Sequence, residues 1–173
     1  MAELPGAIRI VAGGPERVPD LEHLSRSLHR FHVGVDPGLP GIPPRDGDGW
    51  WRIRSAREAA WLTLPDAFVL VAEDGDVPVG YALVSFHEED DSHATGARFA
   101  EVHTLAVAPE RRGEGIGTAL LHEVYRRVRA LGVGEMLIGV LATNDRALAF
   151  YEREGFRPWV TMTLGKVPDP DAV

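Results

Sequence analysis

Three glycines at alternate positions, Gly113, Gly115 and Gly117, separate a strand-like segment from a helix-like segment. The segment before them, residues 98–109, alternates apolar and polar residues and ends at a proline, which is typical of a strand. After them, apolar residues recur on one face of a predicted helix until Gly132. A strand, a glycine-rich turn and a helix together favour an anion site. The helix start presents unpaired N–H groups, and glycines allow a ligand to approach the backbone closely.

The residues around the glycines restrict which kind of anion site this is. Arg111 and Arg112 precede them and carry charge suited to phosphate oxygens. A turn that merely begins a helix remains an alternative, because a lone glycine motif is a weak signal. A Walker loop requires a lysine, but Thr118 follows Gly117 directly. A dinucleotide fingerprint requires a βαβ unit, whereas the strands before this turn are predicted to form hairpins.

The rest of the chain alternates predicted strands and helices. Periodicity and turn residues predict strands at 7–12, 67–74, 77–89, 98–109, 135–142 and 156–165. They predict helices at 19–32, 50–64, 116–131 and 144–154. The order β-α-α-β-β-β-α-β-α-β indicates an α/β fold with a sheet of mixed direction. The strand at 135–142 is nearly all apolar, so we expect it to be buried on both faces.

Length, composition and net charge limit the classes of function that the chain can have. A length of 173 residues predicts one domain, 1–173, with frayed ends at 1–6 and 166–173. No apolar run is long enough for a membrane helix, and the first residues do not predict a secretory signal. The absence of cysteine excludes disulfides and thiolate chemistry and fits a cytoplasmic protein. A net charge of −8 argues against nucleic-acid binding.

The stretch Arg112-Gly113-Glu114-Gly115-Ile116-Gly117 resembles a motif of the Gcn5-related N-acetyltransferase (GNAT) family. The segments EVHTLAVAP and NDRALAFYEREGF resemble that family's neighbouring motifs. The resemblance is strong over 98–157 and weak before about 66. It implies a mixed, mostly antiparallel sheet of about six strands flanked by about four helices, with the fourth and fifth strands splayed apart.

The resemblance also implies acetyl-CoA as co-substrate. Backbone groups of the strand before the loop would hold the pantetheine arm, and the Val107 amide would stabilise the oxyanion. The loop amides would hold the pyrophosphate. Asn144 would touch the cofactor, although a helix N-cap is an equally good role for it. The implied cofactor-binding set is Leu105, Ala106, Val107, Arg112, Gly113, Glu114, Gly115, Ile116, Gly117, Thr118, Asn144 and Tyr151.

Two residues are candidates for catalysis. By resemblance, the Tyr151 hydroxyl would protonate the leaving thiolate; otherwise Tyr151 is a core tyrosine. Glu101 resembles the strand glutamate that acts as general base, with its pKa raised by burial; otherwise it is an exposed strand residue. His103 is the rival base. His29 and His32, which end the first predicted helix, could line the acceptor pocket, or they are ordinary polar residues.

No metal is expected. The acidic run Glu88–Asp91 with His93 lacks the spacing and glycine of a calcium loop. We therefore expect an N-acetyltransferase that transfers directly to a primary amine of a small molecule or of a peptide or protein, without nucleic-acid or membrane partners. The sequence leaves a homodimer open. The alternative from another class is a non-catalytic sensor that binds acetyl-CoA on the same fold.

Overall fold

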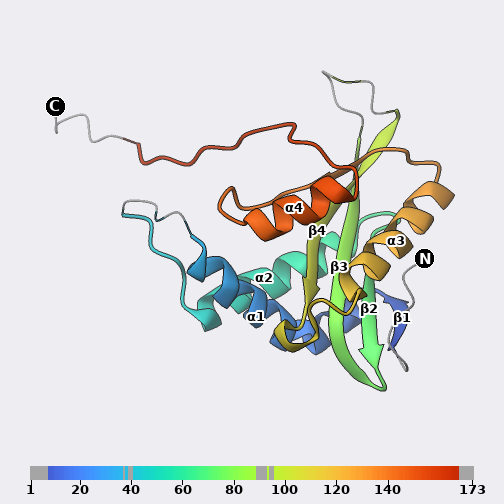
Figure 1. The fold of residues 1–173 in the computed structure, drawn as a ribbon, viewed down its shortest axis with the longest axis horizontal. Coiled ribbons are helices and arrows are strands. Elements are labelled where there is room, and N and C mark those ends of the chain that lie inside the picture. The colour runs from blue at the N-terminus through green and yellow to red at the C-terminus, as the bar shows by residue number, and fades with distance from the viewer. Residues whose placement is uncertain (1–7, 37, 39–40, 89–92, 94–95, 168–173) are drawn as a thin grey trace.

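The strands of the sheet lie side by side in the order in which they occur in the chain (Figure 1). The computed structural model describes residues 8–36, 38, 41–88, 93 and 96–167. The strands are β1 (Ile8–Gly13), β2 (Phe68–Asp74), β3 (Val77–Glu88), β4 (Arg98–Val107) and β5 (Met136–Ile138). The α-helices are α1 (Glu22–Gly34), α2 (Gly47–Trp61), α3 (Ile116–Ala130) and α4 (Asp145–Arg153). Two short 3-10 helices, η1 (Pro15–Leu21) and η2 (Pro109–Arg111), complete the fold. Within the described residues, no helix is both long and apolar enough to cross a membrane.

The sheet is mixed and mostly antiparallel, which confirms the predicted fold class. Strands β1 to β4 pair antiparallel, and β5 is parallel to β4. The β4–β5 ladder covers only Ala100 to Val102. Beyond Val102, β4 continues to Val107, and no described residue of β5 pairs with this part. The splay itself stays a prediction.

The C-terminal part of the sheet differs from the prediction, so the described residues form five strands and not six. The predicted strand 156–165 is irregular, and the segment 156–167 runs past α4 toward the C-terminus (Figure 1). Alternation suggested a strand, but Pro158 cannot donate a ladder hydrogen bond. The strand predicted at 135–142 shortens to β5 and is half-buried, not buried on both faces. The reason is that β5 is the edge strand, with no described strand on its outer side.

Two apolar clusters cover the two faces of the sheet. One joins the sheet to α3 and includes Leu120 and Val124. The other joins it to η1, α1 and α2 and includes Leu21 and Leu83. Strand β3 approaches α3 closely at Gly80. A Cβ there would lie 3.0 Å from the carbonyl oxygen of Ala106 and 3.2 Å from side-chain atoms of Ile116 and Leu120.

One irregularity of β4 places the side chains of the site. Leu83 pairs with Thr104 but Val84 pairs with Val102, so β4 has one extra residue, His103, at this point. Such a β-bulge shifts the alternation of side chains along the strand. As a result Ala100 and Val102 pack on the α3 face, while Thr104 and Ala106 face α1 and α2.

Candidate active site

The glycine turn has the conformation that an anion cradle requires. Gly113 and Gly115 have φ angles of 91° and 80°, in the left-handed region that residues with a Cβ rarely adopt. The helix α3 begins directly afterwards, at Ile116. The first N–H with a helical partner is that of Ala119, which donates to the Gly115 carbonyl over 2.9 Å. Within the described chain, the N–H groups of residues 116–118 have no such partner. They therefore form the positive end of the helix dipole.

The two arginines before the turn differ in whether their charge is free to bind an anion. Arg111 lies 2.8 Å from Asp74 and 2.9 Å from Glu114, so its charge is neutralised by protein carboxylates. The expectation that it serves phosphate oxygens is therefore not supported. The Arg112 guanidinium lies over the Phe31 ring, 5.2 Å from its centroid, and burial lowers the pKa of Arg112. Glu114 uses its carboxylate on Arg111, which leaves its backbone for a ligand.

The end of β4 meets the glycine turn. A Cβ on Gly117 would lie 3.6 Å from Val107 Cγ2, and Arg112 Nε donates to the Val107 carbonyl over 3.4 Å. The N–H of Ala108 donates to Val79 of β3 over 2.9 Å. Because successive residues of a strand direct their backbone groups to opposite edges, the N–H groups of Val107 and Leu105 point away from β3. This edge of β4 is the one that β5 leaves unpaired beyond Val102.

The two predicted residues of α4 have defined roles. The Asn144 side chain accepts a hydrogen bond from the N–H of Ala147 over 3.2 Å, so it caps the helix. Tyr151 is 8% exposed, and its ring packs against Phe150 and Phe156. Burial, followed by the nearby Tyr125, raises the pKa of Tyr151, so the phenol keeps its proton at neutral pH. No described contact joins Tyr151 to Glu101.

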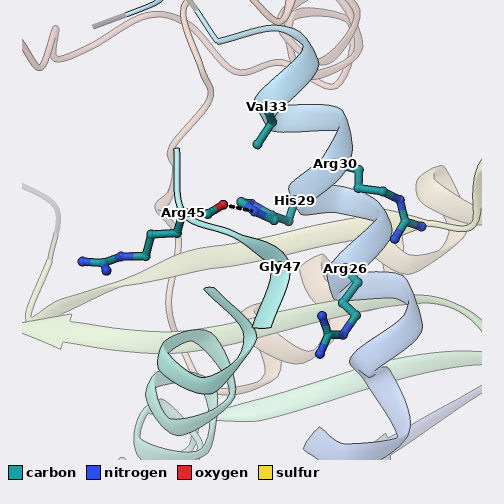
Figure 2. A pocket seen from close by; sticks show the side chains of 6 residues that line it. All are labelled: Arg26, His29, Arg30, Val33, Arg45 and Gly47. Atoms are coloured by element: carbon teal, nitrogen blue, oxygen red, sulfur yellow. Dashed lines mark hydrogen bonds between the residues drawn. The ribbon is translucent and has the colours of Figure 1, made fainter. Parts of the chain in front are cut away.

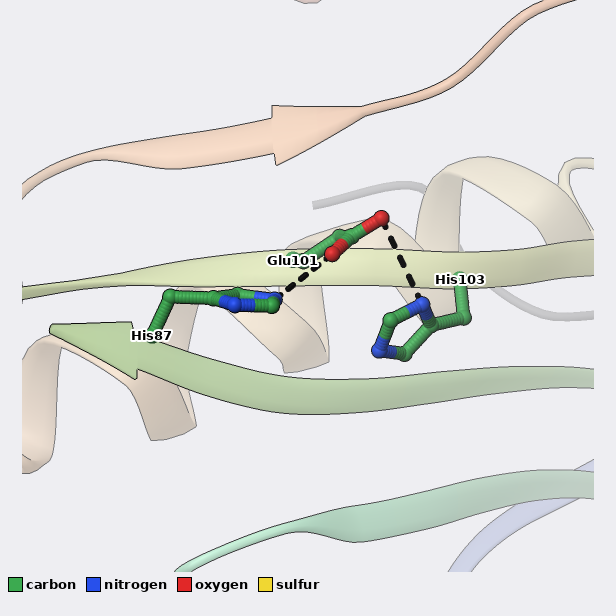
Figure 3. Close-up of side chains that lie close together, drawn as sticks. All are labelled: His87, Glu101 and His103. Atoms are coloured by element: carbon green, nitrogen blue, oxygen red, sulfur yellow. Dashed lines mark ion pairs between the residues drawn. The ribbon is translucent and has the colours of Figure 1, made fainter. Parts of the chain in front are cut away.

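Glu101 lies between two histidines (Figure 3). One of them, His103, stacks on Trp61 of α2. Oε2 of Glu101 lies 2.6 Å from Nε2 of His87, and its Oε1 lies 3.4 Å from Nδ1 of His103. Hydrogen bonding from His103, and then attraction by both histidines, lowers the pKa of Glu101. The expected upward shift is therefore wrong, because the imidazoles outweigh the partial burial of the carboxylate.

His103 is held rigidly. Its ring stacks on Trp61 of α2, with 3.7 Å between centroids and an angle of 6° between planes. Its Nε2 lies 2.7 Å from the hydroxyl oxygen of Ser85. The side chain is only 5% exposed. A histidine with this environment is oriented by the protein and presents Nδ1 to Glu101.

A buried polar network lies beneath this group. Glu58 of α2 is fully buried, and its Oε1 accepts from Arg54 Nε over 2.8 Å and from the Tyr81 hydroxyl over 3.1 Å. The Tyr81 hydroxyl is also within 2.5 Å of the Ser25 hydroxyl. Arg54 reaches onward to the Thr104 hydroxyl of β4. The network therefore joins α1, α2, β3 and β4.

A cavity of about 400 Å³ lies where α1 faces the start of α2 (Figure 2). His29 lines it, stacks on Trp50 with 4.6 Å between ring centroids, and lies 3.0 Å from the Arg45 carbonyl. His32 does not line it, so only one of the two proposed histidines belongs to this cavity. The other lining residues are Arg26, Arg30, Val33, Arg45 and Gly47.

Several site residues were not found from the sequence. His87 follows Ser85 at strand spacing, and Glu101 and His103 have the same spacing on the next strand, so pairing the two strands would have brought them together. Trp61 and Glu58 carry no local signal for their contacts with β4. Of the acidic run considered for a metal, residues 89–91 lie outside the described residues.

Comparison with known proteins decides the family. A sequence profile of the acetyltransferase (GNAT) family matches residues 41–156, which is more than half of the chain. The chain belongs to this family. The GNAT match begins within the loop before α2 and ends just after α4, so it includes the glycine turn, β4 and the histidine–glutamate group.

Individual relatives agree with this assignment. The chain is 31% identical to a mycothiol acetyltransferase of Beutenbergia cavernae, over 90% of this chain and 61% of that protein. It spans less than two thirds of the length of the curated relatives it matches. The fold resembles a GCN5-related N-acetyltransferase from Ralstonia eutropha JMP134, with a TM-score of 0.72 at 17% identity, covering 92% of this chain and 98% of that one. It also resembles the aminoglycoside N-acetyltransferase AAC(6')-Iy in complex with CoA, with a TM-score of 0.67 at 16% identity, covering 95% and 99%.

The backbone of the turn gives a direct test of its conformation. We expect Gly115→Ala to lower the free energy of unfolding by about 1–2 kcal/mol, because a Cβ disfavours the left-handed region. Gly117→Ala is the matched control. It lies inside α3 without a positive φ, and its new Cβ would make only ordinary contacts, so its stability should be unchanged or slightly higher. Urea unfolding measures both; equal losses would contradict the conformational explanation.

Proposed function

We propose that the protein transfers an acetyl group from acetyl-CoA to a primary amine. The observation that carries this proposal is the row of N–H groups at residues 116–118, which have no partner among the described residues and lie where β5 leaves the backbone edge of β4 unpaired. Membership of the acetyltransferase family supports it, as does the similarity to an acetyltransferase fold that holds CoA. The relatives' activities belong to those proteins, and the proposal for this chain rests on its own site.

The cofactor would bind along two elements. The pyrophosphate would accept hydrogen bonds from the N–H groups of residues 116–118 and from the turn before them. The pantetheine arm would add to the free edge of β4 at Leu105 and Val107, as an extra strand would. This places the thioester carbonyl where the Val107 N–H can donate to it. Asn144 caps α4, the helix that follows β5 in the chain.

The chemistry then needs the substrate nitrogen to lose two protons and the departing thiolate to gain one. Glu101 accepts a proton from the substrate ammonium, directly or through water, and the freed amine attacks the thioester carbon. The new C–N bond forms, the carbonyl oxygen gains negative charge, and the Val107 N–H stabilises it. When the C–S bond breaks, the thiolate takes the proton of Tyr151, and the second proton lost by the substrate nitrogen returns to the phenol through water. The raised pKa of Tyr151 keeps it protonated until that step.

The acceptor is an amine whose identity the site leaves open between two classes. A small-molecule amine is the first candidate, since the similar proteins include a mycothiol acetyltransferase and an aminoglycoside acetyltransferase. The cavity between α1 and α2 is lined by His29, a residue that the sequence offers for the acceptor pocket. An amine of a peptide or protein is the second candidate.

The alternative function is a sensor that binds acetyl-CoA without turning it over. Both functions use the same glycine turn, and they differ in whether Glu101 and Tyr151 act on a bound substrate. A proton acceptor and a protonated phenol, neither of which cofactor binding requires, favour the enzyme.

Cofactor binding is the first requirement of the proposal. We expect acetyl-CoA at a hundredfold excess over its Kd to add about 2.7 kcal/mol to the free energy of unfolding, because it binds only the folded chain. Gly115→Val should abolish the binding seen by calorimetry, whereas Arg112→Ala should weaken it less. A folded Gly115→Val protein with unchanged affinity would place the cofactor elsewhere.

Turnover distinguishes the enzyme from the sensor. We expect release of free CoA when acetyl-CoA is incubated with a panel of primary amines that includes small polyamines, amino sugars, amino acids and short peptides. The thiol is measured with a chromogenic disulfide, and the acetylated amine by mass spectrometry. Tight cofactor binding without any acetylated product across the panel would favour the sensor.

Tyr151 should act in the chemical step. The change Tyr151→Phe keeps the ring that packs on Phe150 and Phe156 and removes only the hydroxyl. We expect kcat to fall by about 10²–10⁴, with little change in acetyl-CoA affinity or Tm, because the proton matters only as the C–S bond breaks. Tyr125→Phe is the control, since it removes a hydroxyl that bonds to the Glu154 carbonyl and affects Tyr151 only through its charge, so kcat should fall far less than in Tyr151→Phe. A less stable Tyr151→Phe protein with normal kcat would make Tyr151 a structural residue.

A further inference from the structure

His87, Glu101 and His103 form a group whose geometry exceeds the needs of a proton acceptor. Each offers one ligand atom, and these three atoms all lie within 4.8 Å of one another. Both carboxylate oxygens of Glu101 are engaged, one by each imidazole. Figure 3 shows the two rings approaching the carboxylate from opposite sides. Amine deprotonation requires only one acceptor.

The sheet brings the three side chains together. Ser85 pairs with Glu101, so His87 is the diagonal neighbour of Glu101 on the same face. Glu101 and His103 are two apart on β4, so strand alternation places both on the face toward α2. The arrangement is therefore fixed by backbone register, which gives a ligand set that already exists in the folded chain.

His103 is oriented for coordination. Metal-bound histidines use one ring nitrogen for the metal and are oriented by a hydrogen bond at the other. The Ser85 hydroxyl lies 2.7 Å from Nε2 of His103, and Trp61 holds the plane of the ring. Nδ1 of His103 then points toward Glu101. When the His103 ring is neutral with its proton on Nε2, the lone pair of Nδ1 can bind a metal ion.

We propose that His87, Glu101 and His103 bind one divalent transition-metal ion, of the class of zinc, cobalt or nickel. Two imidazoles and a carboxylate suit these ions, whereas magnesium and calcium prefer oxygen ligands. Metal–nitrogen bonds of about 2.0–2.1 Å place tetrahedral ligand atoms roughly 3.3 Å apart. Some of the three ligand atoms are now farther apart than this. The His87 side chain is 43% exposed, so its ring can rotate to bring its nitrogen closer to the other two ligand atoms. The metal ion takes the place of the N–H hydrogens between the two imidazoles and Glu101, and these protons are released to solvent.

The nearby positive charge does not oppose this site. Arg54 contacts the His103 carbonyl, but its Nε is 2.8 Å from the buried Glu58 carboxylate. Its charge is therefore compensated within the network. Three protein ligands leave a coordination position for water or for an amine.

One consequence of the site rests on the proposed function. Metal on Glu101 occupies the oxygens that would accept the substrate proton, so transition-metal ions inhibit acetyl transfer and chelators restore it. Metal binding itself is independent of acetyl-CoA. It can therefore be measured in the absence of cofactor and of any amine.

The test uses tag-free full-length protein, stripped with a chelator and titrated with Co²⁺ while calorimetry and visible absorption are recorded. We expect one Co²⁺ per chain, with the absorption bands of a low-coordinate ion, and displacement by Zn²⁺. The variant His87→Gln removes a half-exposed ligand and should weaken Co²⁺ binding at least about tenfold. Melting curves verify that this variant is folded.

The matched control is His122→Gln. His122 is 45% exposed and lies 3.2 Å from Glu154, so it is also a histidine–glutamate pair, but it belongs to no group of three ligands among the described residues. We expect this variant to bind Co²⁺ as wild type does. The proposal is overturned if wild type takes up no stoichiometric Co²⁺, if folded His87→Gln keeps its affinity, or if His122→Gln loses as much. Acetyl-CoA binding by the metal-free protein tests the proposed function separately.

Discussion

The extra residue in β4 at His103 sets the chemistry of both faces of the sheet. A regular strand would place residues 100, 102, 104 and 106 on one face, where all four would pack against α3. The bulge moves the second pair to the face of α1 and α2, so that Thr104 joins Glu101 and His103 there. In the same step it turns the N–H groups of residues 105 and 107 toward the edge that β5 does not cover. One inserted residue thus aligns the polar group with the free backbone edge.

The buried carboxylate of Glu58 keeps α2 in place against this bulge. Its Oε1 collects hydrogen bonds from Arg54 and Tyr81, while its Oε2 is buried without a partner among the described residues. A buried carboxylate is costly to keep, and removing one partner of such a pair destabilises strongly. Trp61 lies three residues after Glu58, on the same side of α2. The hydrogen bonds of Glu58 therefore also hold the Trp61 indole against the His103 ring.

Most of the fold could be predicted because its signals are local. Alternation located β2, β3 and β4, and the helical stripe after Gly117 located α3. The strand predicted at 156–165 failed because alternation indicates a strand but not a partner for it. The bulge could not be predicted, because the sequence of 98–107 has no residue that marks where the side chains change face. His87 and the downward pKa shift of Glu101 were missed for a related reason: both depend on which residues of β3 and β4 face each other.

The close approach at Gly80 connects the start of α3 with the end of β4. The α-carbon of Gly80 lies under Ile116, the residue that opens α3, and beside the Ala106 carbonyl of β4. A side chain at this position would have to displace either the first turn of the helix or the strand, by a few tenths of an ångström. The distance between the N–H groups at the start of α3 and the edge of β4 is therefore set by Gly80 of β3. A side chain at position 80 would therefore change the spacing of the turn and the strand that we propose to hold acetyl-CoA, without touching the cofactor.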